Sequence, residues 1–351
     1  MKGLTIIKTM SYALVVASML CSCDVLGSAD KHEIIFKADG YSTKANYSNT
    51  NSFQLIWEDG DKIDLFSSFD DEHSDPQLES AAYSVTAINT SQPWECSLSA
   101  ESTSLKWYDR TTSHDFYASY PKAKGTYNNH RVTFPIPYTQ NNASDYMKNA
   151  FMVASASGLT YETAPDHVVS LAFKPIMTTL VITLVGKADD ATDAGRRIVN
   201  SVAFKTRMPD NGDGTFSYLP ASNTAYAAPS EKTVTWAPTS ALTLNGAADE
   251  EHAETATFTV FLPFTEISNS NPLQVKVFCK DKDDKDKTYF VTVDNVTITA
   301  GSKIYLKASP FSDLPTASES GLAFSTAMMG IVDDPNDEDL SNNTTYPWER
   351  L

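Results

Sequence analysis

Short stretches in which apolar and polar residues alternate constrain the fold of this chain more than any other feature. They recur between residues 34 and 306 and are separated by turn-forming residues, a pattern typical of antiparallel β proteins. The clearest hairpin has strands at 273–279 and 288–293 around a charged turn. Half-buried sheets without helices can cover their apolar faces only by packing on each other, so the sequence predicts an all-β fold of two antiparallel β-sandwich domains.

The expected strands group into two domains. A long strand is predicted at 168–184 with a break at Lys174-Pro175, and the best short candidate for a helix is 144–153. We place the N-terminal domain at 45–165 and the C-terminal domain at 166–309. The other predicted strands are 34–36, 53–57, 62–66, 116–120, 132–136, 199–205, 215–218, 233–236, 256–262 and 304–306.

The first 22 residues have the form of a lipoprotein signal peptide. Two lysines precede a short apolar run that ends in Leu20-Cys21-Ser22-Cys23. A leucine three positions before a cysteine, with a small residue directly before that cysteine, is the pattern cut by the bacterial lipoprotein signal peptidase. We therefore predict export and a lipid on Cys23 that attaches the chain to a membrane. An ordinary secretory signal cut nearby is the alternative.

Charge and cysteine content restrict the possible partners. The net charge is −17, and loss of two lysines with the signal makes the mature chain more acidic. Binding to nucleic acid or to an anionic membrane face needs basic patches, so neither is expected. Once Cys21 is removed and Cys23 is lipidated, Cys96 and Cys279 remain. Because they fall in different predicted domains, we expect two buried thiols, with a disulfide as the alternative.

A search for catalytic, cofactor or metal motifs is negative. The six histidines have no ligand spacing, and no nucleophile elbow, phosphate loop or dinucleotide fingerprint is present. The segment 210–214 resembles a calcium loop, but Ala221 stands where an acidic ligand is required, so we expect a hairpin turn there. No carboxylate pair for glycoside hydrolysis stands out. The five tryptophans could stack sugars, although such residues more often pack in a core: Trp57, Trp94, Trp107, Trp236 and Trp348.

The composition changes at the C-terminus, where 310–351 is predicted to be a linker followed by a strand-like tail. Four large apolar residues of this tail share one strand face: Leu322, Phe324, Met328 and Val332. Such a strand could fill a sheet of another subunit. It could instead be the last strand of its own C-terminal domain, or be disordered.

Several segments, taken in order, resemble the fimbrillin family of Bacteroidales-type pili, also described as major-fimbrium-like lipoproteins. The resemblance runs from the lipidation motif at Cys23 to about residue 307. It is carried by 57–66, 115–121, Gln140 with 145–147, 169–175, 262–263 and 300–305. Pro175 stands where the family usually has histidine.

This resemblance implies two transthyretin-like β-sandwich domains and a lipoprotein exported to the outer membrane. It also implies cleavage by a trypsin-like protease after Lys44, which would remove the anchor segment 23–44 and open a site for a donor strand from another pilus subunit. The expected function is that of a non-enzymatic pilus subunit that supports adhesion to a host or bacterial surface, without cofactors. Many relatives have arginine in place of Lys44, so a permanently lipidated anchor is also possible. The alternative function is a surface glycan-binding lipoprotein.

Overall fold

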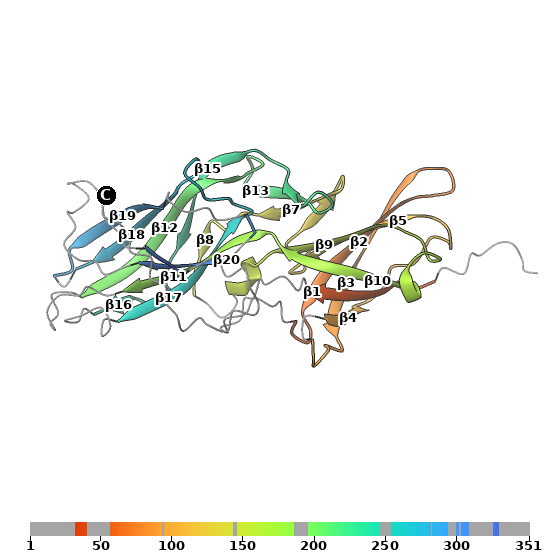
Figure 1. Cartoon of the computed structure of the whole chain (residues 1–351), viewed down its shortest axis with the longest axis horizontal. Helices are drawn as coiled ribbons and strands as arrows, with labels where there is room; N and C mark the ends of the chain where they lie inside the picture. The colour runs from red at the N-terminus through yellow and green to blue at the C-terminus, as the bar shows by residue number, and fades with distance from the viewer. Residues whose placement is uncertain are drawn as a thin grey trace, which may run out of the picture.

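The computed structural model describes residues 32–40, 57–92, 95–142, 146–185, 196–245, 254–281, 283–293, 300–301, 303–308 and 326–329. These residues form strands and two short 3₁₀ helices, η1 (Tyr146–Asn149) and η2 (Pro165–His167), so the fold is all-β as predicted. The strands form two groups along the long axis of the molecule (Figure 1). Within the described ranges, no helix reaches the length and hydrophobicity that a membrane span requires.

Seven strands of the first group hydrogen-bond around a closed path in the order β1-β10-β9-β5-β2-β3-β4, and β4 pairs again with β1. Alternation explains their packing: β2 buries every second residue, beginning with Ile63 and Leu65. We call this group the N-terminal barrel. Its strands are β1 (Ile35–Gly40), β2 (Lys62–Asp70), β3 (Pro76–Thr86), β4 (Glu95–Ala100), β5 (His114–Tyr120), β9 (Met152–Leu159) and β10 (Val168–Pro175).

The second group, the C-terminal sandwich, contains two larger sheets. One has the order β19-β18-β12-β15-β8, with β16 also paired to β12, and the other has the order β17-β11-β20-β21. Trp236 of the first sheet stacks on Phe258 of the second, with ring centroids 3.8 Å apart. The strands are β8 (Thr139–Gln140), β11 (Met177–Val185), β12 (Arg197–Pro209), β15 (Pro229–Trp236), β16 (Leu242–Leu244), β17 (Thr255–Pro263), β18 (Leu273–Lys280), β19 (Asp286–Val293), β20 (Lys303–Ala308) and β21 (Thr326–Met329).

A smaller sheet, in the order β14-β13-β7-β6, adds to this second group. Phe134 and Phe216 face each other across β7 and β13 and belong to the same hydrophobic core as Trp236. The strands of this sheet are β6 (Thr126–Asn128), β7 (Arg131–Pro135), β13 (Thr215–Leu219) and β14 (Thr224–Ala225).

The chain crosses between the two groups near the predicted domain boundary. β10 belongs to the barrel and β11 to the sandwich, and only Ile176 lies between them. Ile176 is buried; its N–H donates to Phe151 O at 3.0 Å, and its carbonyl accepts from Phe264 N–H at 2.9 Å. Earlier in the chain, β7 and β8 already pair with strands of the sandwich. The division into 45–165 and 166–309 stays a prediction. β7 and β8 come before residue 165 but lie in the second group, and β10 comes after residue 165 but lies in the barrel.

Most predicted strands are present, and two local predictions are wrong. The hairpin at 273–293 is confirmed, and the long strand is broken as predicted, although the break falls at Ile176, just after Lys174-Pro175. The predicted helix at 144–153 is limited to η1, because the run from Ala150 to Val153 is buried throughout and enters strand β9. The segment 210–214 is a turn but not a hairpin, because β12 and β13 lie in different sheets. Of the predicted strand 53–57, only Trp57 is described, and it lies outside any strand.

Cys96 lies in the barrel core and Cys279 in the sandwich core, so the prediction of two buried thiols is confirmed. Met328 lies in β21, where its backbone pairs with Leu306 of β20. The other predicted site residues lie outside the described residues, as do the signal peptide at 1–22 and most of the tail: Cys23, Lys44, Leu322, Phe324 and Val332.

Candidate functional site

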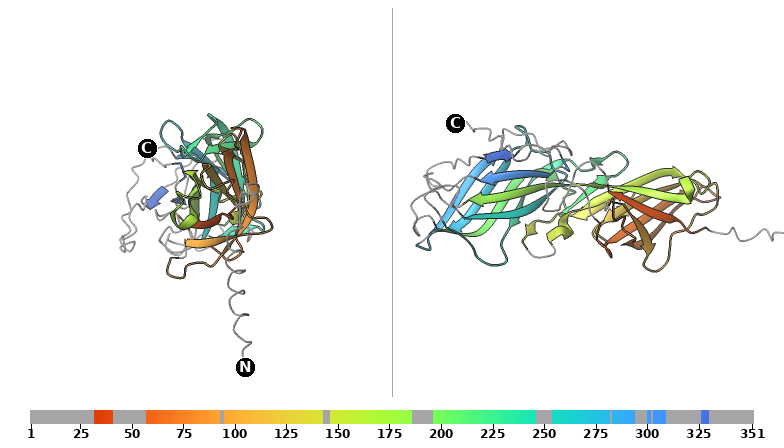
Figure 2. Two further views of the ribbon diagram at one scale, coloured as in Figure 1. Left: turned by 90° about the vertical axis from the view of Figure 1, so that its right-hand side faces the viewer. Right: turned by 60° about the horizontal axis from the view of Figure 1, so that its bottom comes forward.

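Strand β1 closes the N-terminal barrel by filling the position between β4 and β10, which we call the β1 site. The strand lies beside β10 and β4 in the ribbon views (Figures 1 and 2) and runs parallel to β10 and antiparallel to β4. Its Phe36 is opposite Val169 on one side and Leu98 on the other. The chain before β1 continues this pairing, because Ile34 N–H donates to Leu105 O at 3.0 Å. The first described segment of the chain is therefore hydrogen-bonded on both sides.

The inward side chains of this segment are part of the barrel core. Ile34, Phe36 and Ala38 are each at most 2% exposed. The Phe36 ring makes edge contacts with Tyr83 and Phe116, with centroid distances of 5.3 and 5.5 Å. Without these side chains the barrel core would lose its central aromatic contacts.

Ala38 pairs with Cys96 of β4, so the inward position at this end of the strand is small. Cys96 is 5% exposed, and burial raises the pKa of its thiol to about 12. Thiolate is the reactive form of cysteine, so Cys96 is chemically quiet while β1 is in place.

The outward side of β1 is polar and includes a like-charge pair. Asp39 lies directly opposite Glu95 of β4. The pKa of the Asp39 carboxyl is raised, mainly by partial burial and then by the negative charge of Glu95. Like charges at opposed positions of an antiparallel pair are destabilising. The C-terminal end of β1 is therefore its weak point.

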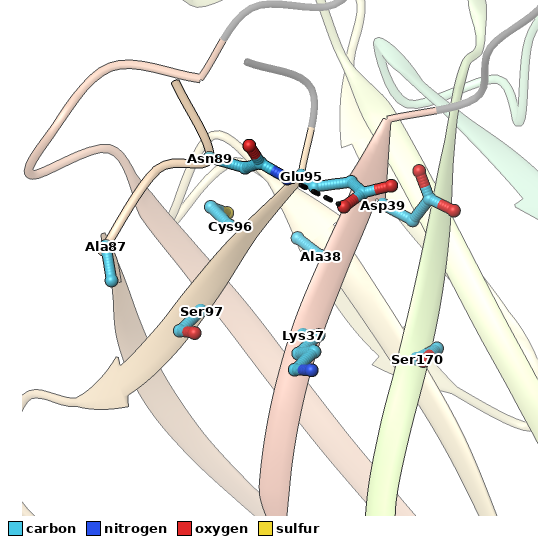
Figure 3. Close-up of a pocket in the computed structure, with 9 residues that line it drawn as sticks. All are labelled: Lys37, Ala38, Asp39, Ala87, Asn89, Glu95, Cys96, Ser97 and Ser170. Carbon is cyan, nitrogen blue, oxygen red and sulfur yellow. Dashed lines mark hydrogen bonds between the residues drawn. The ribbon is translucent and has the colours of Figure 1, made fainter. Parts of the chain in front are cut away.

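A hollow of about 360 Å³ lies over this end of β1 (Figure 3). Its lining comes from β1, from β4 with the loop before it, and from β10, and contains no aromatic residue: Lys37, Ala38, Asp39, Ala87, Asn89, Glu95, Cys96, Ser97 and Ser170. Asn89 donates from Nδ2 to Glu95 Oε2 at 3.2 Å. The hollow lacks the stacking surface that a sugar-binding site usually needs.

The tryptophans that could stack sugars are buried where the structure describes them. Trp57, Trp107 and Trp236 are at most 2% exposed, so none offers an open platform. Trp94 and Trp348 lie outside the described residues.

No metal centre is present among the described residues, and the one contact between a serine hydroxyl and a histidine that the structure shows in the barrel core is closed to solvent. No group of three or more metal-ligating side chains occurs in those ranges. His114 Nδ1 lies 2.8 Å from Ser67 Oγ, but both residues are fully buried. His114 Nε2 accepts from Tyr108 N–H, so a neutral ring donates from Nδ1 to Ser67. Burial lowers the pKa of His114 to about 4, and the pair is structural.

Sequence reasoning identified the strand at 34–36 but not its role in the β1 site. Ile34, Phe36 and Ala38 are apolar at every second position, and this alternation indicates which residues of the strand face the core. The facing pair of Asp39 and Glu95 could not be found in this way, because it depends on which strand lies beside β1.

A family model described as fimbrillin-like matches residues 43–313, most of the chain. The chain belongs to the fimbrillin-like family. This agrees with the resemblance seen in the sequence motifs, and it makes the chain a structural protein of cell-surface fimbriae rather than an enzyme.

The chain is also similar to solved structures of proteins from Bacteroides and Porphyromonas. A candidate cell adhesion protein from Bacteroides uniformis has a TM-score of 0.49 and 13% identity, covering 81% of this chain and 95% of that one. A fimbrial protein from Bacteroides vulgatus has a TM-score of 0.40 and 12% identity, covering 85% and 99%. The fimbrial anchor protein Mfa2 from Porphyromonas gingivalis has a TM-score of 0.37 and 8% identity, covering 80% and 92%. A search of curated protein sequences gave no match.

Proposed function

We propose that this fimbrillin-like chain is a pilus subunit that polymerises by replacing its own β1 with a strand from another subunit. The observation that carries the proposal is the position of β1, which is buried in the barrel core and precedes Lys44 in the chain. A cut after Lys44 separates β1 from the rest of the barrel. A segment so placed can complete the fold of a stored subunit and be removed for assembly.

Removal of β1 leaves a site that favours a new strand. The facing edges of β4 and β10 lose their backbone hydrogen bonds, and the cavities left by Ile34, Phe36 and Ala38 expose the apolar core to water. Unpaired strand edges and open apolar positions are both unfavourable, so an added strand from another chain is strongly favoured.

The donor strand in this proposal is the C-terminal tail, with Leu322, Phe324, Met328 and Val332 on its inward face. Lipid on Cys23 holds the unprocessed subunit at the outer membrane, and cleavage after Lys44 releases it into the fimbrium. A subunit left uncut at Lys44 remains a lipid-bound anchor. The assembled fimbrium then supports adhesion to a surface ligand. The glycan-binding alternative has less support, because the hollow beside β1 lacks aromatic residues.

N-terminal sequencing of the protein from its native cell surface tests the maturation step. A chain starting at Ala45 is expected in polymers, and a lipidated Cys23 in the unprocessed form. The Lys44→Ala chain should stay lipidated and monomeric. The matched control Lys37→Ala, which leaves Lys44 in place, should be cleaved and should polymerise like the unmodified chain. Polymers of the Lys44→Ala chain with an intact N-terminus would overturn the exchange of β1.

Deletion of 321–351 tests the donor strand. The truncated chain should fold and be cleaved but form no polymers when incubated alone, and it should still accept the tail of a full-length subunit. Polymerisation of the truncated chain to the same extent as the full chain would exclude the tail as donor.

A further inference from the structure

We propose a specific register for the incoming strand: Leu322, Phe324 and Thr326 of a second copy take the positions of Ile34, Phe36 and Ala38. The donor runs in the same direction as β1, parallel to β10. This inference rests on the proposed function and adds to it which tail residue enters which position.

The size order of the inward residues supports this register. In β1 the order is a branched aliphatic residue, an aromatic residue and a small residue, and the tail repeats that order in Leu322, Phe324 and Thr326. The middle position is bounded by Tyr83 and Phe116, which fit a phenyl ring. The last position lies opposite Cys96 and holds the small side chain of Ala38, which is buried.

Other registers on the same face fit worse. A shift of two residues one way puts Thr326 at the Phe36 position, which leaves a cavity, and Met328 at the small Ala38 position. A shift the other way puts Phe324 at the Ala38 position. In the reverse direction, Met328 and Thr326 can fill the Phe36 and Ala38 positions, but Gly330 then leaves the Ile34 position empty. Cavities and overpacking both destabilise a core.

The outward residues are compatible with this register and favour the exchange itself. The register replaces Ile35, Lys37 and Asp39 by Ala323, Ser325 and Ala327. Ile35 is 54% exposed in β1, so its replacement by alanine removes exposed apolar surface. Ala327 takes the position opposite Glu95, so the like-charge pair between β1 and β4 disappears. The outgoing strand is thus held less well at this end than the incoming one.

Donation requires the tail to leave its own chain. Within one copy, Thr326–Met329 forms β21 and pairs with β20 over four residues, with Thr326 opposite Ala308. These few edge pairs are all that must open among the described residues of the tail. In the second copy, the same strand can form backbone hydrogen bonds with both β4 and β10, which replace the pairs lost from β20.

Cys96 provides a direct test, because it faces the inward position proposed for Thr326. Neighbouring strands bring opposed residues within disulfide range. In a Cys279→Ser background, Thr326→Cys chains are assembled, oxidised with diamide and separated without reductant. We expect a ladder of covalent oligomers at least tenfold stronger than that of the matched control Ser325→Cys, whose thiol faces outward. Polymers that show no such ladder would overturn the register while leaving strand exchange intact.

A second pair of cysteines tests the direction. In a Cys96→Ser, Cys279→Ser background, Leu98→Cys labels the β4 residue opposite the Phe36 position. Crosslinking to Phe324→Cys is expected, and preferential crosslinking to Met328→Cys would establish the reverse direction and overturn the proposal. Absence of polymers from the unmodified, cleaved chain would overturn both the proposed function and this register.

Discussion

The N-terminal barrel and the C-terminal sandwich each contain a parallel pair that joins a long inner strand to a strand from one end of the fold, and these end strands differ in origin. In the barrel, β1 lies parallel to β10 and comes from the chain before Lys44. In the sandwich, β20 lies parallel to β11 and comes from the far end of the fold. Each of the two strands pairs over six residues on one side and over four on the other. The difference is that β4, the shorter partner of β1, is itself paired with β3, whereas β21, the shorter partner of β20, is the edge of its sheet. In the proposed function the barrel thus depends on a strand that is cut away, whereas the sandwich is completed by a strand that stays.

Phe36→Ala should cause the largest loss of stability, because it empties the aromatic centre of the barrel. Truncation of a buried phenylalanine costs about 3–5 kcal/mol. Chemical denaturation should show a lower free energy of unfolding for the barrel and an unchanged one for the sandwich. Intrinsic fluorescence and hydrogen exchange can follow the two transitions separately. The control Ile35→Ala, on the exposed side of the same strand, should change stability by about 0.5 kcal/mol or less. Equal effects of the two variants would show that β1 is not part of the core.

Acid should weaken the barrel before the sandwich, because His114 lies in the barrel. Its folded-state pKa is lowered from 6.5 to about 4, so the folded state favours the neutral ring. The stability from this group is complete above about pH 6.5 and is lost as the pH falls toward 4, by about 3 kcal/mol in total. Urea denaturation between pH 8 and 4 measures this loss. The exposed His73, replaced by glutamine, should leave the pH profile unchanged, and an unchanged profile in a His114→Phe chain would exclude His114 as the cause.

Gln140→Ala should weaken the sandwich alone and by a smaller amount. The buried amide of Gln140 donates to Phe261 O at 2.7 Å and accepts from Phe261 N–H at 3.0 Å, which joins β8 to the opposite sheet. Loss of two buried hydrogen bonds should cost about 2 kcal/mol in a denaturation experiment. The control Gln77→Ala removes an amide at the rim of the barrel and should have little effect. A loss confined to the barrel would contradict the placement of β8.

Truncation after Ala308 should have the smallest effect, because it removes β21 from an open sheet edge. The expected loss in the unprocessed monomer is about 1 kcal/mol or less, from a few edge hydrogen bonds. Thermal unfolding of the full and truncated chains measures it. A loss of several kcal/mol would mean that the tail packs as the last strand of its own domain. The sandwich would then depend on its tail strand as the barrel depends on β1.

The strands that sequence could predict are those with strong alternation. The hairpin of β18 and β19 and the break between β10 and β11 were both visible in the apolar pattern and the position of Pro175. β3 was missed because the N-terminal half of this strand is largely exposed and carries few apolar residues, whereas β4 was missed although it buries Cys96 and Leu98 in alternation. Alternation shows which face of a strand is buried but not which strand lies beside it. The pairing of β1 with β10, and the facing of Asp39 and Glu95, are therefore properties of the fold alone.

The buried crossing at Ile176 has a mechanical consequence for a filament of such subunits. Tension applied along a subunit would pass from β10 directly into β11, without a flexible linker that could stretch first. Backbone hydrogen bonds to Phe151 and Phe264 brace this crossing from both sides. Each subunit would then act as a stiff rod, and extension of the filament would occur where one subunit's strand slides within the next.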